Sequence, residues 1–322
     1  MRLQSSEWVD HFKREYLSDF VPRGGATVKF AVLSSEEQRG GVIASLRRAG
    51  EEAGHLVASI DSARTKIHYI ERLVLEANRQ LDWGDIAARS IRAAAASVGI
   101  ELPNDRGPWT AAEIAAFNGR SESAIYGSLD DAVERLFKRN THLAREFGAA
   151  MYSLCRALIR GELDGGGHAV AEWLKGELKL LGDVKRFGLY GKIDRRLGRE
   201  IVRSLGAHLQ QVGVPGLLIL VDALRLQVPK NPKDGLVFYT RSSLLDVFEV
   251  MREFIDGTDA LRGLSVVFVL GDGFLDPEAG GRGLAIYPAL RNRITDDVHD
   301  SRRANPFAAL VRLADGPRTG GG

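Results

Sequence analysis

Apolar and polar residues alternate along the chain at two spacings, one typical of buried strands and one typical of helices. TVKFAVL, residues 27–33, and HLVASID, residues 55–61, are short apolar runs separated by a stretch with helical spacing. Runs of this length are typical of strands covered on both faces, as in a parallel sheet. The chain therefore opens with a strand–helix–strand unit, after a first helix for which Ser6 is the expected N-cap.

The strand pattern returns in the last third of the chain. GLLILVD, residues 216–222, and LSVVFVLGD, residues 264–272, are expected to be buried strands. We expect the helix between them to be capped by Ser242 or Ser243, and residues 287–298 to form a final helix or turn. These segments predict an α/β fold with a parallel sheet.

Residues 62–182 carry helical spacing throughout, with no convincing strand. This stretch is far longer than a simple crossover between parallel strands requires. We therefore expect an α/β core formed by residues 1–61 and 183–313, a helical insertion over residues 62–182, and a flexible tail over residues 314–322.

Composition narrows the classes of function. The chain has 44 Lys and Arg against 42 Asp and Glu, a net charge of +2, so any nucleic-acid contact must come from a local basic patch. A single cysteine, Cys155, excludes an internal disulfide and a cysteine-based zinc site. No long apolar run is present and the N-terminal stretch is charged, so we expect a cytoplasmic protein without a membrane partner.

Two aspartates follow the C-terminal strands. Asp222 ends the most apolar strand, where a carboxylate can hold nucleotide-bound Mg²⁺, the Walker B role; it can equally cap the next turn. The following residue is Ala223 rather than an acid that polarises water, which argues against hydrolysis by the standard route. Asp272 is a candidate sensor of the γ-phosphate, or simply a polar strand end.

The loop after the first strand is where a phosphate-binding loop is expected, yet it departs from the pattern G-x-x-x-x-G-K-[ST]. The segment SSEEQRGG has no lysine, and its two glutamates, Glu36 and Glu37, would repel phosphate. Arg39 is the candidate replacement for the lysine. The other candidate phosphate-binding residues are Ser34, Ser35, Gly40 and Gly41.

Basic side chains gather before the strand that ends at Asp222. With Phe187 and Tyr190 interleaved, they form either a nucleic-acid-binding face or a solvated helix face with internal ion pairs. The residues are Lys185, Arg186, Lys192, Arg195, Arg196, Arg199 and Arg203. Arg291 and Arg293 are further candidates to face a γ-phosphate.

Several stretches together resemble a known family. EWVDHFKREYLSDFVPRGGATVKF, FYTRSSLLDVFEVMREFIDGTDALRGLSVVFV, YPALRNRI and RRANPFAALVRL are similar to the BrxC/BrxD family of P-loop ATP-binding proteins from BREX bacteriophage-exclusion systems, and the chain looks closest to the BrxD type. The resemblance implies an AAA+-like or ORC-like P-loop core, an antiviral setting, ATP with Mg²⁺, and partners among BREX components and DNA.

Three interpretations follow from these observations. The leading one is an ATP-binding protein of a phage-defence system with weak or absent hydrolysis. The alternatives are a non-catalytic scaffold built on an inactive ATPase fold, and a DNA-binding module that uses the basic face. Whether the chain is an enzyme, and whether it forms homo-oligomers, stays open at this point.

Overall fold

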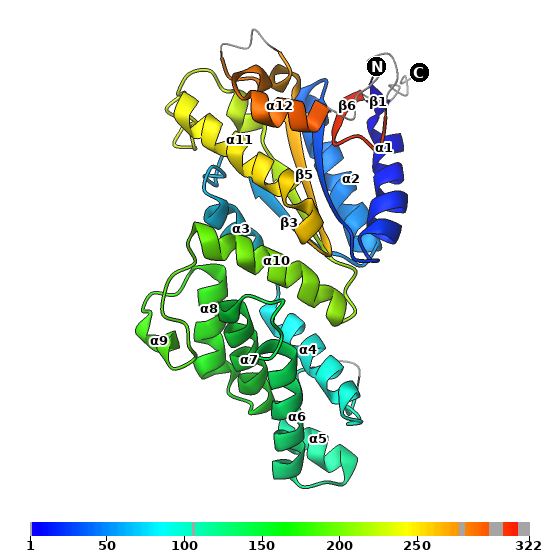
Figure 1. Ribbon diagram of the computed structural model, residues 1–322, viewed down its shortest axis with the longest axis vertical. Coiled ribbons are helices and arrows are strands. Elements are labelled where there is room, and N and C mark those ends of the chain that lie inside the picture. The colour runs from blue at the N-terminus through cyan, green and yellow to red at the C-terminus, as the bar shows by residue number, and fades with distance from the viewer. Residues whose placement is uncertain (1, 105–106, 277–280, 296–304, 315–322) are drawn as a thin grey trace. The chain divides into compact units, whose positions relative to one another are not determined.

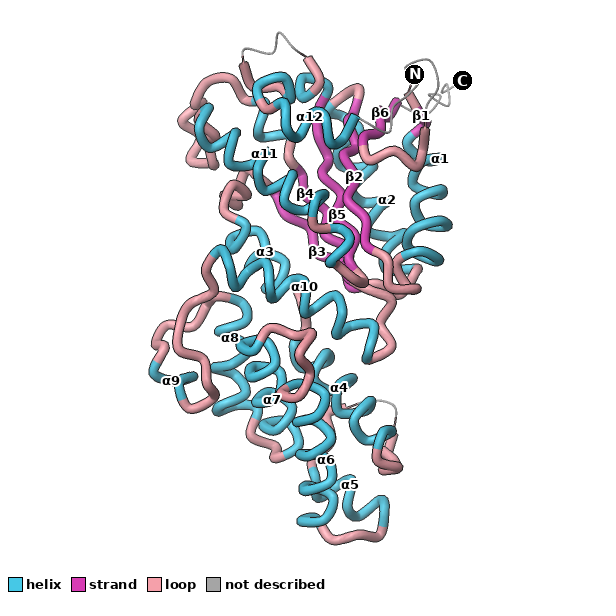
Figure 2. Tube along the Cα trace, in the orientation of Figure 1, coloured by secondary structure: helices cyan, strands magenta, loops and turns pink. Residues whose placement is uncertain are grey.

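The computed structural model describes residues 2–104, 107–276, 281–295 and 305–314 (Figure 1). The chain divides into two compact units, one formed by Met1–Leu73 with Val214–Gly322 and the other by Val74–Gly213. The six described strands belong to the first unit, and the second is built from helices (Figure 2). Of the described helices, none combines the length and the apolar character that crossing a bilayer requires.

The α/β unit has one six-stranded, all-parallel sheet in the order β1-β6-β2-β5-β4-β3. Its strands are β1 (Leu3–Gln4), β2 (Ala26–Leu33), β3 (Leu56–Asp61), β4 (Leu217–Asp222), β5 (Leu264–Gly271) and β6 (Leu310–Ala314). Its helices are α1 (Ser5–Phe12), the π-helix Lys13–Phe20, α2 (Arg39–Glu52), α11 (Arg241–Asp256) and α12 (Pro288–Thr295), and α3 (Ile70–Arg79) crosses into the second unit.

The strands β2 and β4 are not direct neighbours, because β5 lies between them. Leu33 of β2 is aligned with Gly271 of β5, and Asp222 of β4 is aligned with Val269 of the same strand. All three run in parallel, so their C-terminal ends open on the same edge of the sheet. Residues 27–33 and 216–222 therefore end at one edge of the sheet, although β5 separates them.

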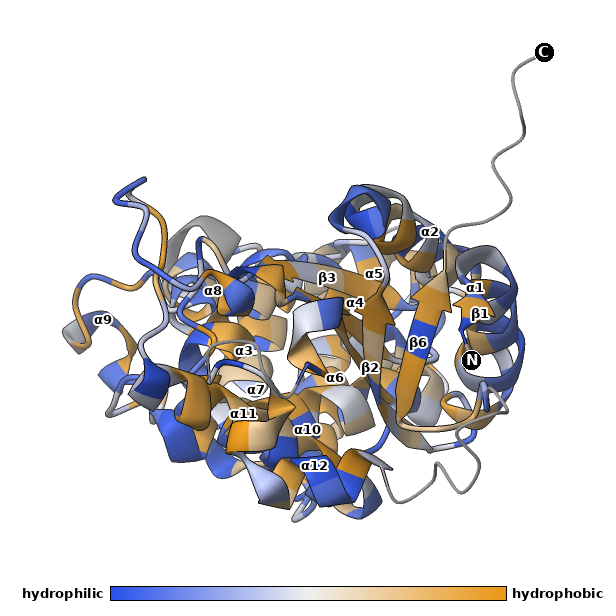
Figure 3. Ribbon diagram, turned by 90° about the horizontal axis from the view of Figure 1, so that it is seen from above, coloured by the Kyte–Doolittle hydropathy of each residue, from blue (hydrophilic) through white to orange (hydrophobic). Residues whose placement is uncertain are grey.

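Helices cover both faces of this sheet. Trp8 and Phe12 of α1, with Leu46 of α2, pack in one buried cluster with alternate residues of β2, β4, β5 and β6. On the opposite face, Phe254 of α11 meets the ring of Phe268 in β5 edge to face. Figure 3 shows the apolar character of the strands that these layers enclose.

Several local expectations need correction. Helix α1 begins at Ser5, after Gln4, so Ser6 is not its N-cap. Helix α11 is capped by Thr240, whose side chain accepts the N–H of Ser243, so neither Ser242 nor Ser243 holds that position. Ala314, expected in the tail, is the last residue of β6, and residues 315–322 lie outside the described part of the chain.

The second unit packs its helices around α7. Its members are α4 (Trp83–Ser97), α5 (Ala111–Asn118), α6 (Glu122–Phe137), α7 (Arg145–Ile159), α8 (His168–Lys175), α9 (Gly182–Lys185) and α10 (Arg195–Gln211). Helix α10 is tied to this unit by two buried hydrogen bonds, one between Ser90 and His208 at 2.9 Å and one from the Ala144 N–H to Ser204 at 2.8 Å.

Candidate functional site

Asp222 lies at the C-terminal end of β4 and points to the sheet face covered by α1 and α2. Side chains alternate along a strand, and Leu218 and Leu220 both belong to the cluster on that face, so Asp222 follows them. The residue is only 7% exposed. Its Oδ1 accepts the Leu224 N–H at 3.3 Å, and its Oδ2 accepts a hydrogen bond from Arg39 Nε.

Arg39 is the first residue of α2 and bridges two carboxylates. It forms an ion pair with Asp222, and its Nη2 lies 3.8 Å from Oδ1 of Asp61. Asp61 ends β3 and is aligned with Asp222 in the register of β3 and β4. Like charges on adjacent strands repel, so the guanidinium stabilises both strand ends. Burial raises the pKa of Asp222 above its ordinary value, while the Arg39 charge opposes that rise.

The loop between β2 and α2 leaves backbone accessible. Ser35 Oγ accepts the Glu37 N–H at 3.2 Å and caps the short 3₁₀ turn Glu36–Gln38, whereas α2 starts without a side-chain cap. A Cβ added to Gly40 or Gly41 would meet nothing within 4 Å. The packing therefore does not require either glycine, although glycine weakens a helix relative to alanine. The Arg39 N–H donates to the Glu36 carbonyl, so the exposed backbone at the start of α2 is that of Gly40 and Gly41.

A small pocket of about 280 Å³ lies beside this helix start. Three serines, Ser5, Ser6 and Ser45, line it together with Gln38 and Gly41, so hydroxyl groups and exposed backbone meet there. Val9 and Val42 add an apolar wall to this pocket, which lies between the start of α1 and the start of α2.

Asp272 follows β5 at the same edge of the sheet. It is half exposed and accepts a hydrogen bond from Arg2 at 2.7 Å. A Cβ added to the residue before it, Gly271, would lie 2.6 Å from Oε1 of Gln227, so the Gln227 side chain would have to move. Gln227 also donates to the Gly271 carbonyl at 2.7 Å, which fixes this strand end.

The structure does not gather all of the candidate residues. Arg293 forms an ion pair at 2.9 Å with Asp256, the last residue of α11, and Arg291 is exposed on α12. Helix α12 packs against α11, on the opposite face from Arg39. In the contacts of the described chain, neither arginine reaches Asp222.

The basic stretch belongs to the helical unit. Arg196 donates two hydrogen bonds of 2.8 Å to Glu200, so one internal ion pair of the expected kind is present on α10. Arg195, Arg199 and Arg203 are exposed on the same helix, and Lys185 and Lys192 are exposed in and after α9. Arg186, the C-cap of α9, has its guanidinium 4.7 Å from the ring of Phe187.

Asp61 lies at this edge but was not among the candidate residues predicted from the sequence. It ends the stretch HLVASID, as Asp222 and Asp272 end theirs, so the same strand-end signal was present. Its partnership with Arg39 depends on the order of the strands, which the local sequence does not contain.

The donor set at this edge fits nucleotide-bound Mg²⁺ better than a metal held by protein alone. Among the described residues, no group of three or more His, Cys, Asp or Glu side chains could hold a metal ion. Mg²⁺ bound to a nucleotide needs only one or two carboxylates, because phosphates and water supply the other ligands. Asp222, with Asp61 beside it, meets that requirement once Arg39 has moved away.

Comparison with known proteins identifies one family. The model described as "BREX system ATP-binding protein BrxC/D" matches residues 111–315, more than half of the chain. The matched range contains Asp222 and Asp272 but begins after Arg39 and Asp61. Searches of curated proteins and of solved structures found no match.

Proposed function

The chain belongs to the BrxC/BrxD family of BREX system ATP-binding proteins, and we propose that it binds ATP at the carboxyl edge of its sheet. The observation that carries the proposal is the ion pair between Arg39 at the start of α2 and the buried Asp222 at the end of β4. In this pair Arg39 would compensate the charge of a phosphate and Asp222 would bind the metal, at the edge where parallel sheets bind ligands. Membership of a BREX system implies other BREX components as partners.

Each group at this edge has a separate role in the proposal. The N–H groups of Gly40 and Gly41 and the hydroxyls of Ser34 and Ser35 bind phosphate oxygens, and Arg39 replaces the missing lysine. Because Arg39 occupies an Asp222 oxygen, it has to leave before that carboxylate is free to hold Mg²⁺. Bound Mg²⁺ would supply charge neutralisation between the β- and γ-phosphates.

The position of Asp272 supports an AAA+-like arrangement as part of the same proposal. Strand β5, which Asp272 follows, lies between β2 and β4. A nucleotide held between the loop after β2 and the end of β4 would therefore lie across the end of β5. Asp272 is placed to respond to its γ-phosphate after releasing Arg2.

Hydrolysis is expected to be weak or absent. Ala223, where an active enzyme carries an acid that polarises water, has no exposed surface. A carboxylate at that position would have to be buried, which is costly without a partner. The loop also lacks a lysine, and Glu36 and Glu37 are exposed beside it.

The test is calorimetric titration of ATP with Mg²⁺ into the purified full chain. We expect Asp222→Ala to abolish Mg²⁺-dependent binding, whereas Asp19→Ala, which removes an exposed carboxylate before the start of β2, leaves it unchanged. Thermal unfolding of both variants checks that they fold. Unchanged ATP affinity in Asp222→Ala would remove Asp222 from the site.

The second candidate function is a non-catalytic scaffold for BREX partners. The buried Ala223 and the acidic loop favour it over an active ATPase. If the chain captures BREX partners but gives no heat of binding when titrated with ATP, the scaffold function is supported. If the Asp222→Ala variant loses partner capture, a nucleotide-dependent function is supported instead.

A further inference from the structure

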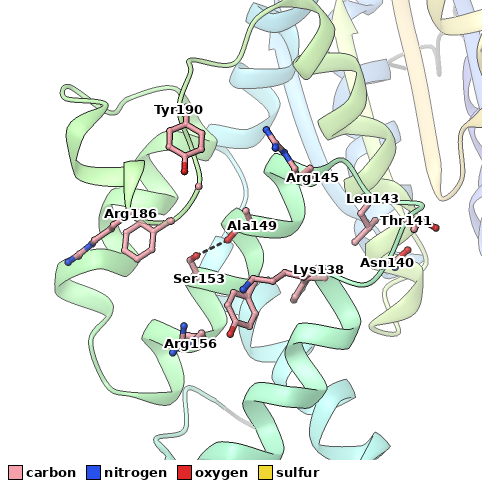
Figure 4. Close-up of a pocket in the computed structure, with 14 residues that line it drawn as sticks. Lys138, Asn140, Thr141, Leu143, Arg145, Ala149, Ser153, Arg156, Arg186 and Tyr190 are labelled. Carbon is pink, nitrogen blue, oxygen red and sulfur yellow. Dashed lines mark hydrogen bonds between the residues drawn. The ribbon is translucent and has the colours of Figure 1, made fainter.

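A second candidate site lies wholly inside the helical unit. A cavity of about 680 Å³ is enclosed by the end of α6, the first turns of α7 and the loop that follows α9 (Figure 4). Its lining includes Lys138, Arg145, Arg156 and Arg186. Among the described residues that line it, none is acidic.

Two glycines explain why these segments meet. A Cβ on Gly148 would lie 2.8 Å from the Phe137 carbonyl oxygen, so α7 packs against the last residue of α6 only because glycine is there. This contact brings Lys138 next to α7. Gly188 has φ +80°, in the left-handed region that favours glycine, and it turns the chain after Phe187 back toward α7.

Aromatic rings rather than carboxylates hold two of the four cations. Lys138 Nζ lies 3.8 Å from the centre of the Tyr152 ring, and the Arg186 guanidinium lies against Phe187. The other two have acidic partners: Arg156 lies 3.0 Å from Asp130, and Arg145 lies 3.3 Å from Glu146. The cavity therefore has an excess of positive charge, which attracts anions.

The rim carries an exposed aromatic side chain. Tyr190 is 67% exposed, an unusual position for a large ring, and it comes from the loop opposite Lys138 and Arg156 (Figure 4). An exposed ring beside a basic groove is a platform on which a nucleobase can stack. Asn140, Thr141 and Ser153 add hydrogen-bonding groups to the lining.

We propose that this cavity binds a nucleotide unit of a single-stranded nucleic acid, with phosphates near Lys138, Arg156 and Arg186 and the base on Tyr190. The volume lies within the range of about 300–1,000 Å³ that is typical of ligand sites. A free nucleoside monophosphate has the same chemistry, and the test separates the two sources.

The experiment measures fluorescence anisotropy of a short, labelled single-stranded DNA with the full chain, without ATP. The test variant is Lys138→Ala with Arg186→Ala. The matched control is Lys179→Ala with Arg120→Ala, which removes the same two charges from exposed positions of the same unit that do not line the cavity. We expect only the test variant to lose affinity. The slope of its log affinity against log salt concentration should become shallower by about 1.4, because two phosphate contacts on a single strand are lost.

A second pair of variants tests stacking. Tyr190→Ala should weaken binding by about 5- to 150-fold, and Tyr190→Phe should retain it, because the phenyl ring preserves the stacking surface. Asp222→Ala should leave binding of the single-stranded DNA unchanged, which separates this site from the proposed ATP site.

Competition with thymidine monophosphate separates the two ligand sources. If it displaces the DNA strand at similar concentrations, the cavity is assigned to free nucleotides; if it does not, the cavity is assigned to the strand. Absence of DNA binding, or equal losses in the test and control variants, overturns the proposal.

Discussion

The ion pair between Arg39 and Asp222 predicts a stability defect whose size depends on pH. Arg39→Ala leaves a carboxylate that is 7% exposed beside Asp61, without its cation. Breaking a fully buried pair in this way costs about 3–5 kcal/mol. The Arg39 side chain is 42% exposed, so solvent screens part of the interaction. We therefore expect the free energy of unfolding to fall by about 2 kcal/mol at neutral pH.

The direction of the pH dependence follows from the pKa of Asp222. Burial already raises this pKa in the folded state, and loss of Arg39 raises it further. A carboxyl group whose folded pKa exceeds its unfolded pKa favours folding while it is protonated, and this contribution disappears as pH rises through the folded pKa. The defect of Arg39→Ala should therefore be largest at neutral pH and smaller in mild acid. Adding Asp222→Asn removes the unpaired charge and should restore much of the loss.

The assay is differential scanning calorimetry of the full chain at neutral and mildly acidic pH. For a unit of this size, a loss of about 2 kcal/mol lowers the Tm by about 4–8 °C. Arg64→Ala is the control, because Arg64 approaches Asp61 at 3.9 Å with an 80% exposed side chain and its removal leaves Asp222 paired. The prediction is wrong if Arg39→Ala and the control have the same Tm at neutral pH, or if adding Asp222→Asn to Arg39→Ala lowers the Tm further.

Two further predictions concern a glycine and a histidine. Gly40→Ala places a Cβ in open space and should leave the free energy of unfolding unchanged or up to about 1 kcal/mol higher, while weakening ATP binding in calorimetry. Gly50→Ala, whose Cβ would lie 2.7 Å from Leu218, should instead destabilise the fold. Unchanged ATP affinity in Gly40→Ala would contradict a close approach of phosphate to the backbone. Burial lowers the pKa of His208 from 6.5 to about 4, so the helical unit should lose about 3 kcal/mol as pH falls between these values. Urea unfolding across this range should give a flatter pH profile for His208→Gln, and an unchanged profile would refute the assignment.

The buried strands could be predicted from the sequence because their constraint is local. Continuous apolar runs at 27–33 and 216–222 have to be covered on both faces, and β2 and β4 begin and end within one residue of them. Strand β6 was missed because it is short and carries Arg312, which is exposed, between apolar residues. Its pairing with β2 makes it a strand, and that partner is far away in the sequence.

The site could be predicted only in part for the same reason. A carboxylate after an apolar strand is a local signal, and it identified Asp222 and Asp272. The ion pair that joins Arg39 to Asp222 spans 183 positions, and it requires β4 and the start of α2 to meet at one edge. The sequence suggested Arg39 as a phosphate-binding residue but gave no sign of its carboxylate partners.

The charges at this edge would determine what form of ATP the proposed site accepts. Arg39 faces two carboxylates, Asp222 and Asp61, and the exposed Arg64 lies 3.9 Å from Asp61, while the exposed Glu36 and Glu37 add two further negative charges on the loop. A polyphosphate without a metal would increase this excess of negative charge, because two arginines cannot compensate both the carboxylates and the phosphates. In the proposed site Asp222 would hold a nucleotide-bound metal, whose positive charge would reverse that balance, and Arg39 would then be free to face the phosphates. If the proposed site is correct, ATP binding should therefore require Mg²⁺ more strictly than in a phosphate loop with a lysine, and ATP binding of equal strength in the presence of a chelator would contradict this charge argument.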